Sequence, residues 1–415
     1  MGIKLRIGVM IFSSIIALYA ILGGLLPRYG VIAGNDPYSQ MNIFHEVLSR
    51  IVEDYVDEPN LEKVRIGALR GLAEGLDPYS AYLTPEQVSQ FQAADSDRQA
   101  SCGMTISKVA GYVYVVAVVK KGPADHAGVK AGDVLEYINN QPTRDMSLYD
   151  ALGLLKGPAG KEVELRVFRG GRSQTLKVKL AEFSPPEPTG KLLSPAIGYL
   201  QVASLQKGQS VAIKNQLRSL VDQGIKSLVL DLRGVADGKI EEAVAVANLF
   251  IGQGVLAKLV GKEAKEIKSF EAQPERRIFK GALVAIIDRT TAGAAEAIAA
   301  AILENKVGEV IGERTFGAGG EQELFRLRDG GGMLITTKKY ASPSGRPFLG
   351  STSATSGVTP SVEVKISSGP DLSAIEQIQE EGIHSPGAGV SAPSPDSGED
   401  LLLKKAIELL RQPKS

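Results

Sequence analysis

Short apolar runs alternate with helical stretches between Ile197 and Ile311, and this alternation constrains the fold more than any other feature. The run KSLVLDL, residues 226–232, is almost wholly apolar, which is typical of a parallel strand covered on both faces. A second run, ALVAII at 282–287, leads into a stretch in which seven of the ten residues from 292 to 301 are alanine, the strongest helix former. A third strand is expected at 309–311. Strand, crossover helix and strand predict a parallel sheet with right-handed connections.

The alanine-rich helix needs a start signal, and Thr290 and Thr291 are its expected N-caps. A glycine-rich loop follows the third strand, and units of this type place chemistry at strand ends and helix N-termini. The first two glycines of this loop have the spacing of a phosphate-binding P-loop. However, Ala318 and Gly319 stand where that motif requires Lys and then Ser or Thr, so nucleotide binding is not expected.

The segment 288–322, DRTTAGAAEAIAAAILENKVGEVIGERTFGAGGEQ, resembles the active-site segment of the C-terminal processing peptidases, also called tail-specific proteases. In that family a serine attacks the peptide carbonyl and a lysine is the general base. The resemblance puts Gly293 at the serine position and Ala318 at the lysine position. The matching positions are Glu296, Gly312, Glu313, Thr315, Phe316, Gly317, Gly319 and Gln322.

Neither Gly293 nor Ala318 carries a group that can attack a carbonyl or accept a proton. Loss of the nucleophile from a unit of this kind costs a factor of roughly 10⁶ in rate. We therefore expect no catalytic residues, although Gln322 is retained, and a chain that is not an enzyme but a peptide-binding scaffold or regulator. The competing interpretation is an active serine-type endopeptidase of the same family.

A further departure from the family lies in DLRGVADG, residues 231–238, where the family has DLRNNPGG and forms part of its oxyanion hole. Two readings of Asp237 are open. Its carboxylate would oppose catalysis if it faced a developing oxyanion. Alternatively, it points outward from a surface turn.

Residues 101–180 resemble a PDZ domain, a module that adds a peptide strand to its own sheet edge. The strongest string is GPADHAGVKAGDVLEYINNQ at 122–141. The resemblance implies a carboxylate-binding loop at 101–106 and a helical groove wall at 147–155, with peptides or protein C-termini as ligands. The expected peptide-binding residues are Gly103, Met104, Thr105, Ile106, Leu148 and Leu152.

Residues 7–26 are uncharged, and as a helix of about 30 Å they would match one bilayer core. Lys4 and Arg6 precede them, which favours a cytoplasmic N-terminus. The preferred interpretation is an uncleaved anchor, with a cleaved signal peptide and a buried soluble helix as alternatives. The expected location is a single pass through the inner membrane, with the bulk of the chain periplasmic or extracellular.

Composition excludes several functional classes. Lys plus Arg and Asp plus Glu both total 47, so no net field attracts nucleic acid. The single Cys102 leaves no internal disulfide, and three widely spaced histidines do not suggest a metal site or cofactor. The expected partners are peptides, the membrane, and either a second copy of the chain or an active relative.

These patterns predict a multi-domain α/β protein whose core resembles the crotonase/Clp-like fold of the tail-specific proteases. The predicted regions are a membrane anchor or signal segment at 1–34, a helical region at 35–97, a PDZ domain at 98–183, an α/β core at 184–366, and a linker with a C-terminal helix at 367–415.

Overall fold

The computed structural model describes residues 37–93, 100–109, 111–352, 354–364 and 400–412. The chain divides into two compact units at Gly67. The smaller unit contains helix α2, Pro37–Asp54, and the first part of α3, Leu61–Glu74.

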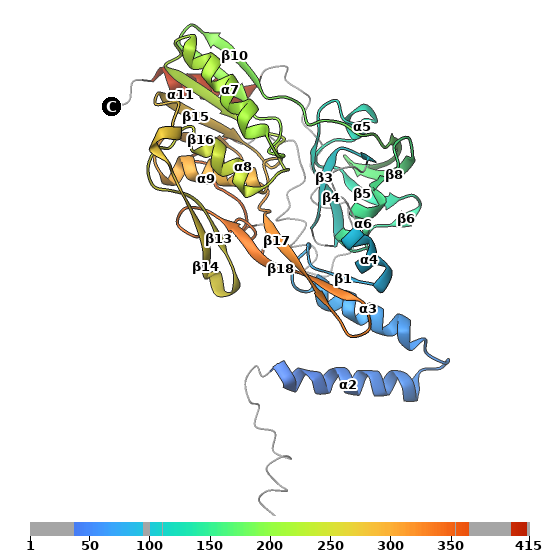
Figure 1. The fold of residues 1–415 in the computed structure, drawn as a ribbon. Coiled ribbons are helices and arrows are strands. Elements are labelled where there is room, and N and C mark those ends of the chain that lie inside the picture. Colours follow the sequence, from blue (N-terminus) through green and yellow to red (C-terminus); the bar gives the residue numbers. More distant parts are fainter. Residues whose placement is uncertain (1–36, 94–99, 110, 353, 365–399, 413–415) are drawn as a thin grey trace, which may run out of the picture. The chain divides into compact units, whose positions relative to one another are not determined.

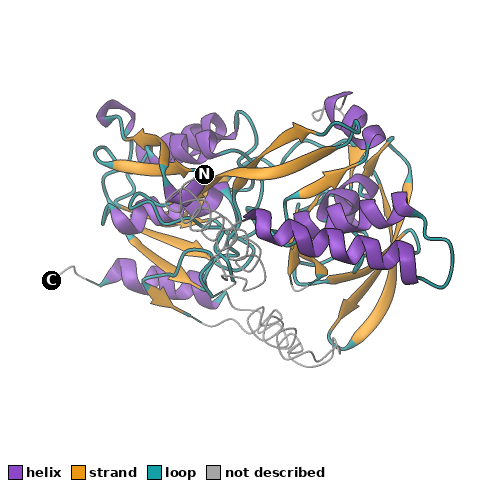
Figure 2. Cartoon of the chain, turned by 90° about the horizontal axis from the view of Figure 1, so that it is seen from below, coloured by secondary structure: helices purple, strands orange, loops and turns teal. Residues whose placement is uncertain are grey.

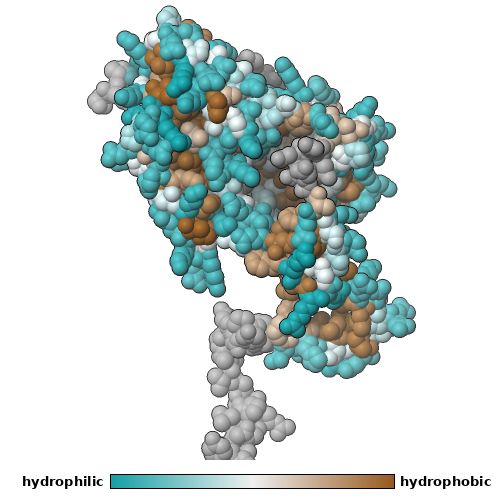
Figure 3. All heavy atoms as spheres, viewed as in Figure 1, coloured by the Kyte–Doolittle hydropathy of each residue, from teal (hydrophilic) through white to brown (hydrophobic). Residues whose placement is uncertain are grey.

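Apolar side chains of α2 are exposed to solvent. The sequence predicted a helical region at 35–97, and α2 lies within it, but Phe44 is 47% exposed and Val47 52%, and Tyr55, directly after the helix, is 58% exposed. The space-filling view in Figure 3 shows apolar atoms at the surface of this part of the chain. Apolar residues at helical spacing therefore identify this helix without implying that its apolar face is buried.

Within the described residues, no helix combines the length and apolar composition needed to cross a bilayer. This finding contradicts the expected single-pass location in the inner membrane. The physical reason is that the described helices carry charges: α2, for example, includes Glu46, Arg50, Glu53 and Asp54. The run 7–26, on which the expectation depended, lies outside the described residues.

The larger unit is built around a six-stranded sheet in the order β10-β11-β12-β15-β16-β19 (Figure 1). The strands from β11 to β19 are parallel, and β10 is an antiparallel edge. This confirms the predicted α/β class and the central strand–helix–strand unit, which is β15, α9 and β16. The bounds are β10 Thr189–Ser194, β11 Ile197–Gln201, β12 Ser227–Asp231, β15 Ala282–Ile287, β16 Glu309–Gly312 and β19 Val362–Glu363, with α7 Gln209–Asp222, α8 Ile240–Ala247 and α9 Ala294–Glu304.

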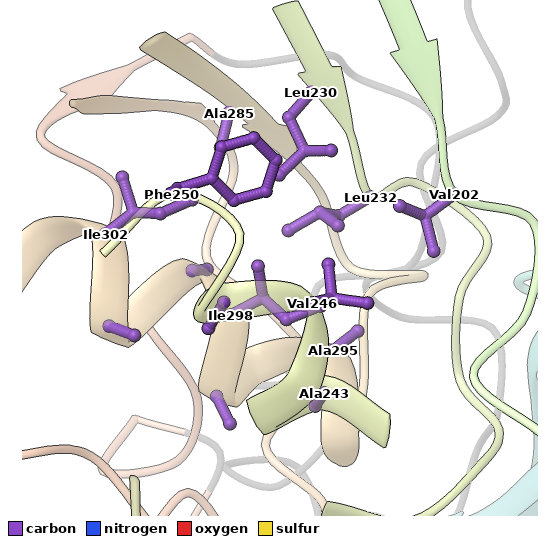
Figure 4. Close-up of a cluster of buried hydrophobic side chains, with 14 of the residues drawn as sticks. Val202, Leu230, Leu232, Ala243, Val246, Phe250, Ala285, Ala295, Ile298 and Ile302 are labelled. Carbon is purple, nitrogen blue, oxygen red and sulfur yellow. The ribbon is translucent and has the colours of Figure 1, made fainter. Parts of the chain in front are cut away.

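Helices cover both faces of this sheet (Figures 1 and 2). On one face, α7, α8 and α9 contribute to the main core, in which Leu230, Val246, Phe250 and Ile298 interlock (Figure 4). On the other face lies α11, Leu401–Arg411, whose Leu402 and Ala406 are fully buried against β11, β12, β15 and β16. Burial of an apolar side chain from water contributes roughly 1.5–3 kcal/mol, so both layers stabilise the sheet.

A second sheet, the PDZ-like sheet, has the strand order β3-β4-β5-β8-β9 and its own hydrophobic core. Its first strand, β3, is an edge. Helix α6, Leu148–Leu154, is capped by Ser147, whose hydroxyl accepts a hydrogen bond from the Asp150 N–H. The other bounds are β2 Ala100–Ser101, β3 Met104–Val109, β4 Tyr112–Val118, α5 Pro123–His126, β5 Val134–Ile138, β6 Gln141–Pro142, β7 Lys156–Gly157, β8 Glu162–Arg169 and β9 Arg172–Lys179.

A third sheet, in the order β1-β18-β13-β14 with β17 beside β18, was not predicted. Its pairings join distant parts of the chain, such as Ala81 with Leu334 and Lys258 with Ala341. Hydrophobic periodicity within one segment does not report such partners. The bounds are β1 Ala81–Leu83, α4 Pro85–Ala93, β13 Val255–Val260, β14 Glu266–Glu271, β17 Gly320–Arg326 and β18 Gly332–Ala341.

Candidate functional site

A pocket of about 240 Å³ lies between the PDZ-like sheet and the start of α9. It is lined from one side by Thr105 and Ile106 of edge strand β3. From the other side it is lined by Gly293, Ala318 and Gln322. The structure thus brings the two dyad positions, the retained glutamine and part of the expected peptide-binding loop to one cavity.

Gly293 is the N-cap of α9 and lies at a sharp turn between strand and helix. Its φ of 63° and ψ of −120° are strained for any residue with a side chain. A Cβ added at this position would nevertheless meet no atom within 4 Å. The position has room for a side chain, and only its backbone conformation opposes one.

The prediction that Thr290 and Thr291 cap α9 is wrong, because the helix begins later than expected. The Thr290 hydroxyl donates to Asp288 Oδ1 at 2.5 Å and accepts from the Gly234 N–H at 2.6 Å. The Thr291 hydroxyl donates to the Leu232 carbonyl at 3.0 Å. Both hydroxyls therefore connect the ends of neighbouring strands instead of capping the helix.

Glu296 connects the two edges of the pocket and is fully buried. Its Oε2 accepts from the Gly293 N–H at 2.7 Å and from the Ala318 N–H at 2.9 Å. Its Oε1 accepts from the Thr315 hydroxyl and from the Gly317 N–H at 2.9 Å. Burial raises the pKa of Glu296 to about 7, against the lowering effect of these four hydrogen bonds. The family match marked this residue, but its bridging role was not predicted.

Gln322 is oriented by a network that reaches back to the N-terminal part of the larger unit. Its Nε2 donates to Thr336 Oγ1 at 3.1 Å, and that hydroxyl donates to Asp77 Oδ1 at 3.1 Å. Asp77 also accepts from the Tyr79 and Ser80 N–H groups. The turn sequence DPYS thus holds both Gln322 and Tyr79, another residue that lines the pocket.

The carboxylate of Asp237 is held by two donors of the loop after β11. It accepts from the Ser204 hydroxyl at 2.6 Å and from the Leu205 N–H at 2.9 Å. Asp237 lines the pocket as well, so it is not an outward surface group. The next residue, Gly238, has φ of 89°, and a Cβ there would lie 1.9 Å from the Leu205 carbonyl oxygen.

The expected peptide-binding residues are divided between two environments. Thr105 and Ile106 line the pocket, and the Thr105 hydroxyl donates to the Ala236 carbonyl at 3.3 Å. Leu148 is buried in the core of the PDZ-like sheet, whereas Met104 and Leu152 are half-buried against that core. Gly103 is buried at φ of 72°. Their role in binding peptides stays a prediction.

Aromatic contacts hold the PDZ-like sheet against the pocket. The rings of Tyr114 and Phe316 stack with their centroids 6.1 Å apart. The hydroxyls of Tyr79 and Ser107 are hydrogen bonded at 3.1 Å. Burial raises the pKa of both Tyr79 and Tyr114 to about 12, so both rings are neutral under ordinary conditions.

Two family models match the chain. Residues 196–364 match peptidase family S41, and residues 114–169 match the PDZ domain. The first match contains β11, α9 and the loop that carries Ala318. The second contains β5, β8 and most of β4, whereas β3 and β9 lie outside it.

Named relatives agree with these matches. The carboxy-terminal processing protease CtpA of Bacillus subtilis is 29% identical over 323 residues, which are 77% of this chain and 68% of that protein. The carboxy-terminal-processing protease of Bartonella bacilliformis is 26% identical over 333 residues, which are 79% of this chain and 76% of that protein. The solved structure of a photosystem II D1 C-terminal processing protease is 25% identical, has a TM-score of 0.64, and covers 83% of this chain and 92% of its own.

These comparisons contradict the expectation that the chain is not an enzyme, because the relatives are named as proteases. The physical reason is that the substitutions at Gly293 and Ala318 remove one mechanism only. A serine protease without its triad still accelerates hydrolysis by about 10³–10⁴ over water, through the oxyanion hole and substrate binding. The two residues exclude a serine–lysine dyad at these positions, and they do not by themselves exclude an enzyme.

Proposed function

Because this chain belongs to the C-terminal processing peptidases of peptidase family S41, we propose that it acts on the C-termini of polypeptides. In this proposal, the PDZ domain binds a free C-terminus at its edge strand β3. The preceding segment of the polypeptide then enters the pocket beside Gly293. Peptide-bond hydrolysis is the reaction class that the names of the relatives favour.

One observation carries the proposal: strand β3 and the start of α9 line the same pocket. Thr105 and Ile106 contribute from the edge strand, and Gly293 and Ala318 from the core. An extended peptide that adds to β3 would therefore run directly beside the pocket. The Tyr114–Phe316 stack and the Thr105–Ala236 hydrogen bond support this arrangement.

The pocket also limits the chemistry that hydrolysis can use. Glycine at 293 and alanine at 318 supply neither a side-chain nucleophile nor an amine base at these two positions. The polar side chains that line the pocket are those of Tyr79, Thr105, Asp237, Gln322 and Tyr340. Burial raises the pKa of both tyrosines to about 12, so neither is a base near neutral pH.

Binding is tested with the full chain and a labelled peptide that has an apolar C-terminus, as the free acid and as the amide. Charge-assisted hydrogen bonds to a carboxylate contribute roughly 1.5–3 kcal/mol, so amidation should weaken binding by about 10- to 100-fold. Equal affinities for the two peptides would overturn the assignment of the carboxylate loop.

Processing is tested by mass spectrometry of the same peptide after incubation with the chain. We expect a shortened product whose formation is lost in Ala318→Trp, because an indole fills the pocket, whereas the expected carboxylate-binding loop at 101–106 keeps its sequence. Peptide binding in that variant is the control. An intact peptide, or a product that forms equally with Ala318→Trp, would contradict processing at this pocket.

A further inference from the structure

One carboxylate holds the two edges of the pocket together. Gly293, at the start of α9, and Ala318, in the loop after β16, donate their N–H groups to the same oxygen, Oε2 of Glu296, at 2.7 and 2.9 Å. Because both backbone nitrogens bond to the same oxygen atom, Gly293 and Ala318 are held close to one another across the pocket. The other oxygen takes two donors from the same loop, Thr315 and Gly317.

The chemistry of these donors selects the charged form of the side chain. Three are backbone N–H groups, which can only donate, and an ionised carboxylate can only accept. A protonated acid can keep all four contacts only if its O–H donates to the Thr315 hydroxyl, which reverses that bond and weakens the same oxygen as an acceptor for the Gly317 N–H. A glutamine would present its amide N–H₂ group toward these donors and must give up at least one of the four hydrogen bonds. Since Glu296 has no exposed surface, water cannot replace a lost partner.

We propose that Glu296 is the positioning residue of the pocket: its ionised carboxylate fixes the start of α9 against loop 315–318, and protonation releases that loop. This role goes beyond the proposed function and does not depend on it. Gly293 and Ala318 are set relative to one another whether or not the chain cleaves peptides. Glu296 acts through the backbone of these residues and does not itself line the pocket.

The surroundings of Glu296 set the pH at which its carboxyl gains or loses a proton. Burial raises its pKa to about 7. Tyr79 is the titratable side chain that faces it, and it is neutral because burial raises its pKa to about 12. The charged neighbours in the loop are engaged elsewhere: Arg314 donates to the Ala354 carbonyl, and Glu313 pairs with Arg289 at 3.9 Å.

A purely structural role would also make Glu296 sensitive to mutation, so the test needs a pH-dependent signal. Phe316–Gly317 is the only Phe-Gly pair in the sequence, and ¹³C′-Phe with ¹⁵N-Gly labelling therefore isolates the Gly317 amide. The Gly293 amide is identified by its loss in Gly293→Ala. These two amides report the loop side and the helix side of the carboxylate.

We expect both amide resonances of the full chain to shift between pH 5.5 and 8.5 with one common midpoint near neutrality. In Glu296→Gln neither should titrate. Two different midpoints, no shift in the wild type, or shifts that persist in Glu296→Gln would overturn the proposal.

A second pair of variants covers the case in which Glu296→Gln does not fold. Thr315→Val removes one donor and should move the common midpoint upward, because the Thr315 hydrogen bond lowers the pKa of Glu296. Thr315→Ser keeps the hydroxyl and should leave the midpoint in place. Identical midpoints in the two variants would contradict the proposal independently.

Discussion

At the scale of single residues, the buried Glu296 links stability to pH. Its pKa is raised from 4.5 to about 7, so the folded chain keeps a proton that the unfolded chain has already lost. The folded state then binds more protons than the unfolded state between these values, and stability falls as pH rises through this range. The extra stability is fully present below about pH 4.5 and absent above about pH 7. The ionised form therefore positions the pocket at a cost in global stability.

The expected size of this effect is about 3 kcal/mol, because the pKa lies at about 7 in the folded chain against 4.5 in the unfolded chain and a tenfold change in proton affinity corresponds to about 1.4 kcal/mol. This contribution is measured by urea unfolding of the wild type and of Glu296→Gln at several pH values between 5 and 8. All other titratable groups are the same in the two proteins, so the difference in their free energies of unfolding reports Glu296 alone. The stability of the wild type relative to the variant should decrease as pH rises. A constant difference across the range would refute the link.

Two glycines of the turn at 234–238, which follows β12, have positive φ but different surroundings. A Cβ at Gly238 would lie 1.9 Å from the Leu205 carbonyl oxygen, whereas a Cβ at Gly234 would meet nothing within 4 Å. Gly234→Ala should therefore cost only the strain of its φ, roughly 1–2 kcal/mol. Gly238→Ala adds an overlap with backbone and should cost about 3 kcal/mol or more. Denaturant midpoints of the two variants compare the costs, and equal values would contradict the turn geometry.

At the scale of elements, α11 is fastened at its first turn. The carboxylate of Asp400 accepts from the Leu403 N–H at 3.0 Å and pairs with Arg233 at 2.7 Å. Arg233 in turn pairs with the buried Asp231. The helix is thereby tied to the end of β12, next to the turn that lines the pocket.

Asp400→Ala should destabilise α11 by about 1–2 kcal/mol, through the lost cap and a partly exposed ion pair. Asp400→Ser keeps a capping oxygen and should recover most of that loss. Hydrogen exchange of 401–411 measures both. Glu408→Ala, which removes only the exposed pair with Lys405, is the matched control and should change little. Equal exchange in Asp400→Ala and the control would contradict the fastening.

Elements with a strong local pattern could be predicted from the sequence, and those defined by distant partners could not. The apolar run 282–287 is β15 residue for residue, and the alanine-rich stretch is α9. The start of α9 was misplaced because the Thr290 and Thr291 hydroxyls bond to Asp288 and Leu232. A capping hydroxyl would instead accept a hydrogen bond from a backbone N–H in the first turn of the helix. Strand β1 was missed because its partner is β18, far along the chain.

At the scale of the whole molecule, the same distinction applies to the site. The family motif identified Gly293, Ala318 and Gln322, and the fold brings all three to one pocket. The motif did not indicate that Glu296 would bridge Gly293 and Ala318, that Asp237 would be held by Ser204 and Leu205, or that β3 would share the pocket. These features depend on how separate sheets pack together.

The last prediction is that peptide cleavage increases when the two missing groups are restored together, in Gly293→Ser with Ala318→Lys. The site has room, since a Cβ at 293 meets nothing within 4 Å. A strand-to-helix turn with strained backbone is also how nucleophilic serines are presented in α/β-hydrolases. The strain costs roughly 1–3 kcal/mol. The lysine would enter a partly desolvated pocket, which lowers the pKa of an amine and makes it a better base.

The two groups act as a unit, so each single variant should match the wild type and only the double variant should gain. A general base contributes roughly 10²–10⁴ in rate, and we expect the lower end because Asp237 remains in the turn. Cleavage of a C-terminal peptide, followed by mass spectrometry, measures the gain. A fluorophosphonate probe should label the introduced serine in the double variant and not in Gly293→Ser alone. If the double variant binds the peptide but shows neither labelling nor gain, the pocket does not hold the geometry of a peptidase cleft.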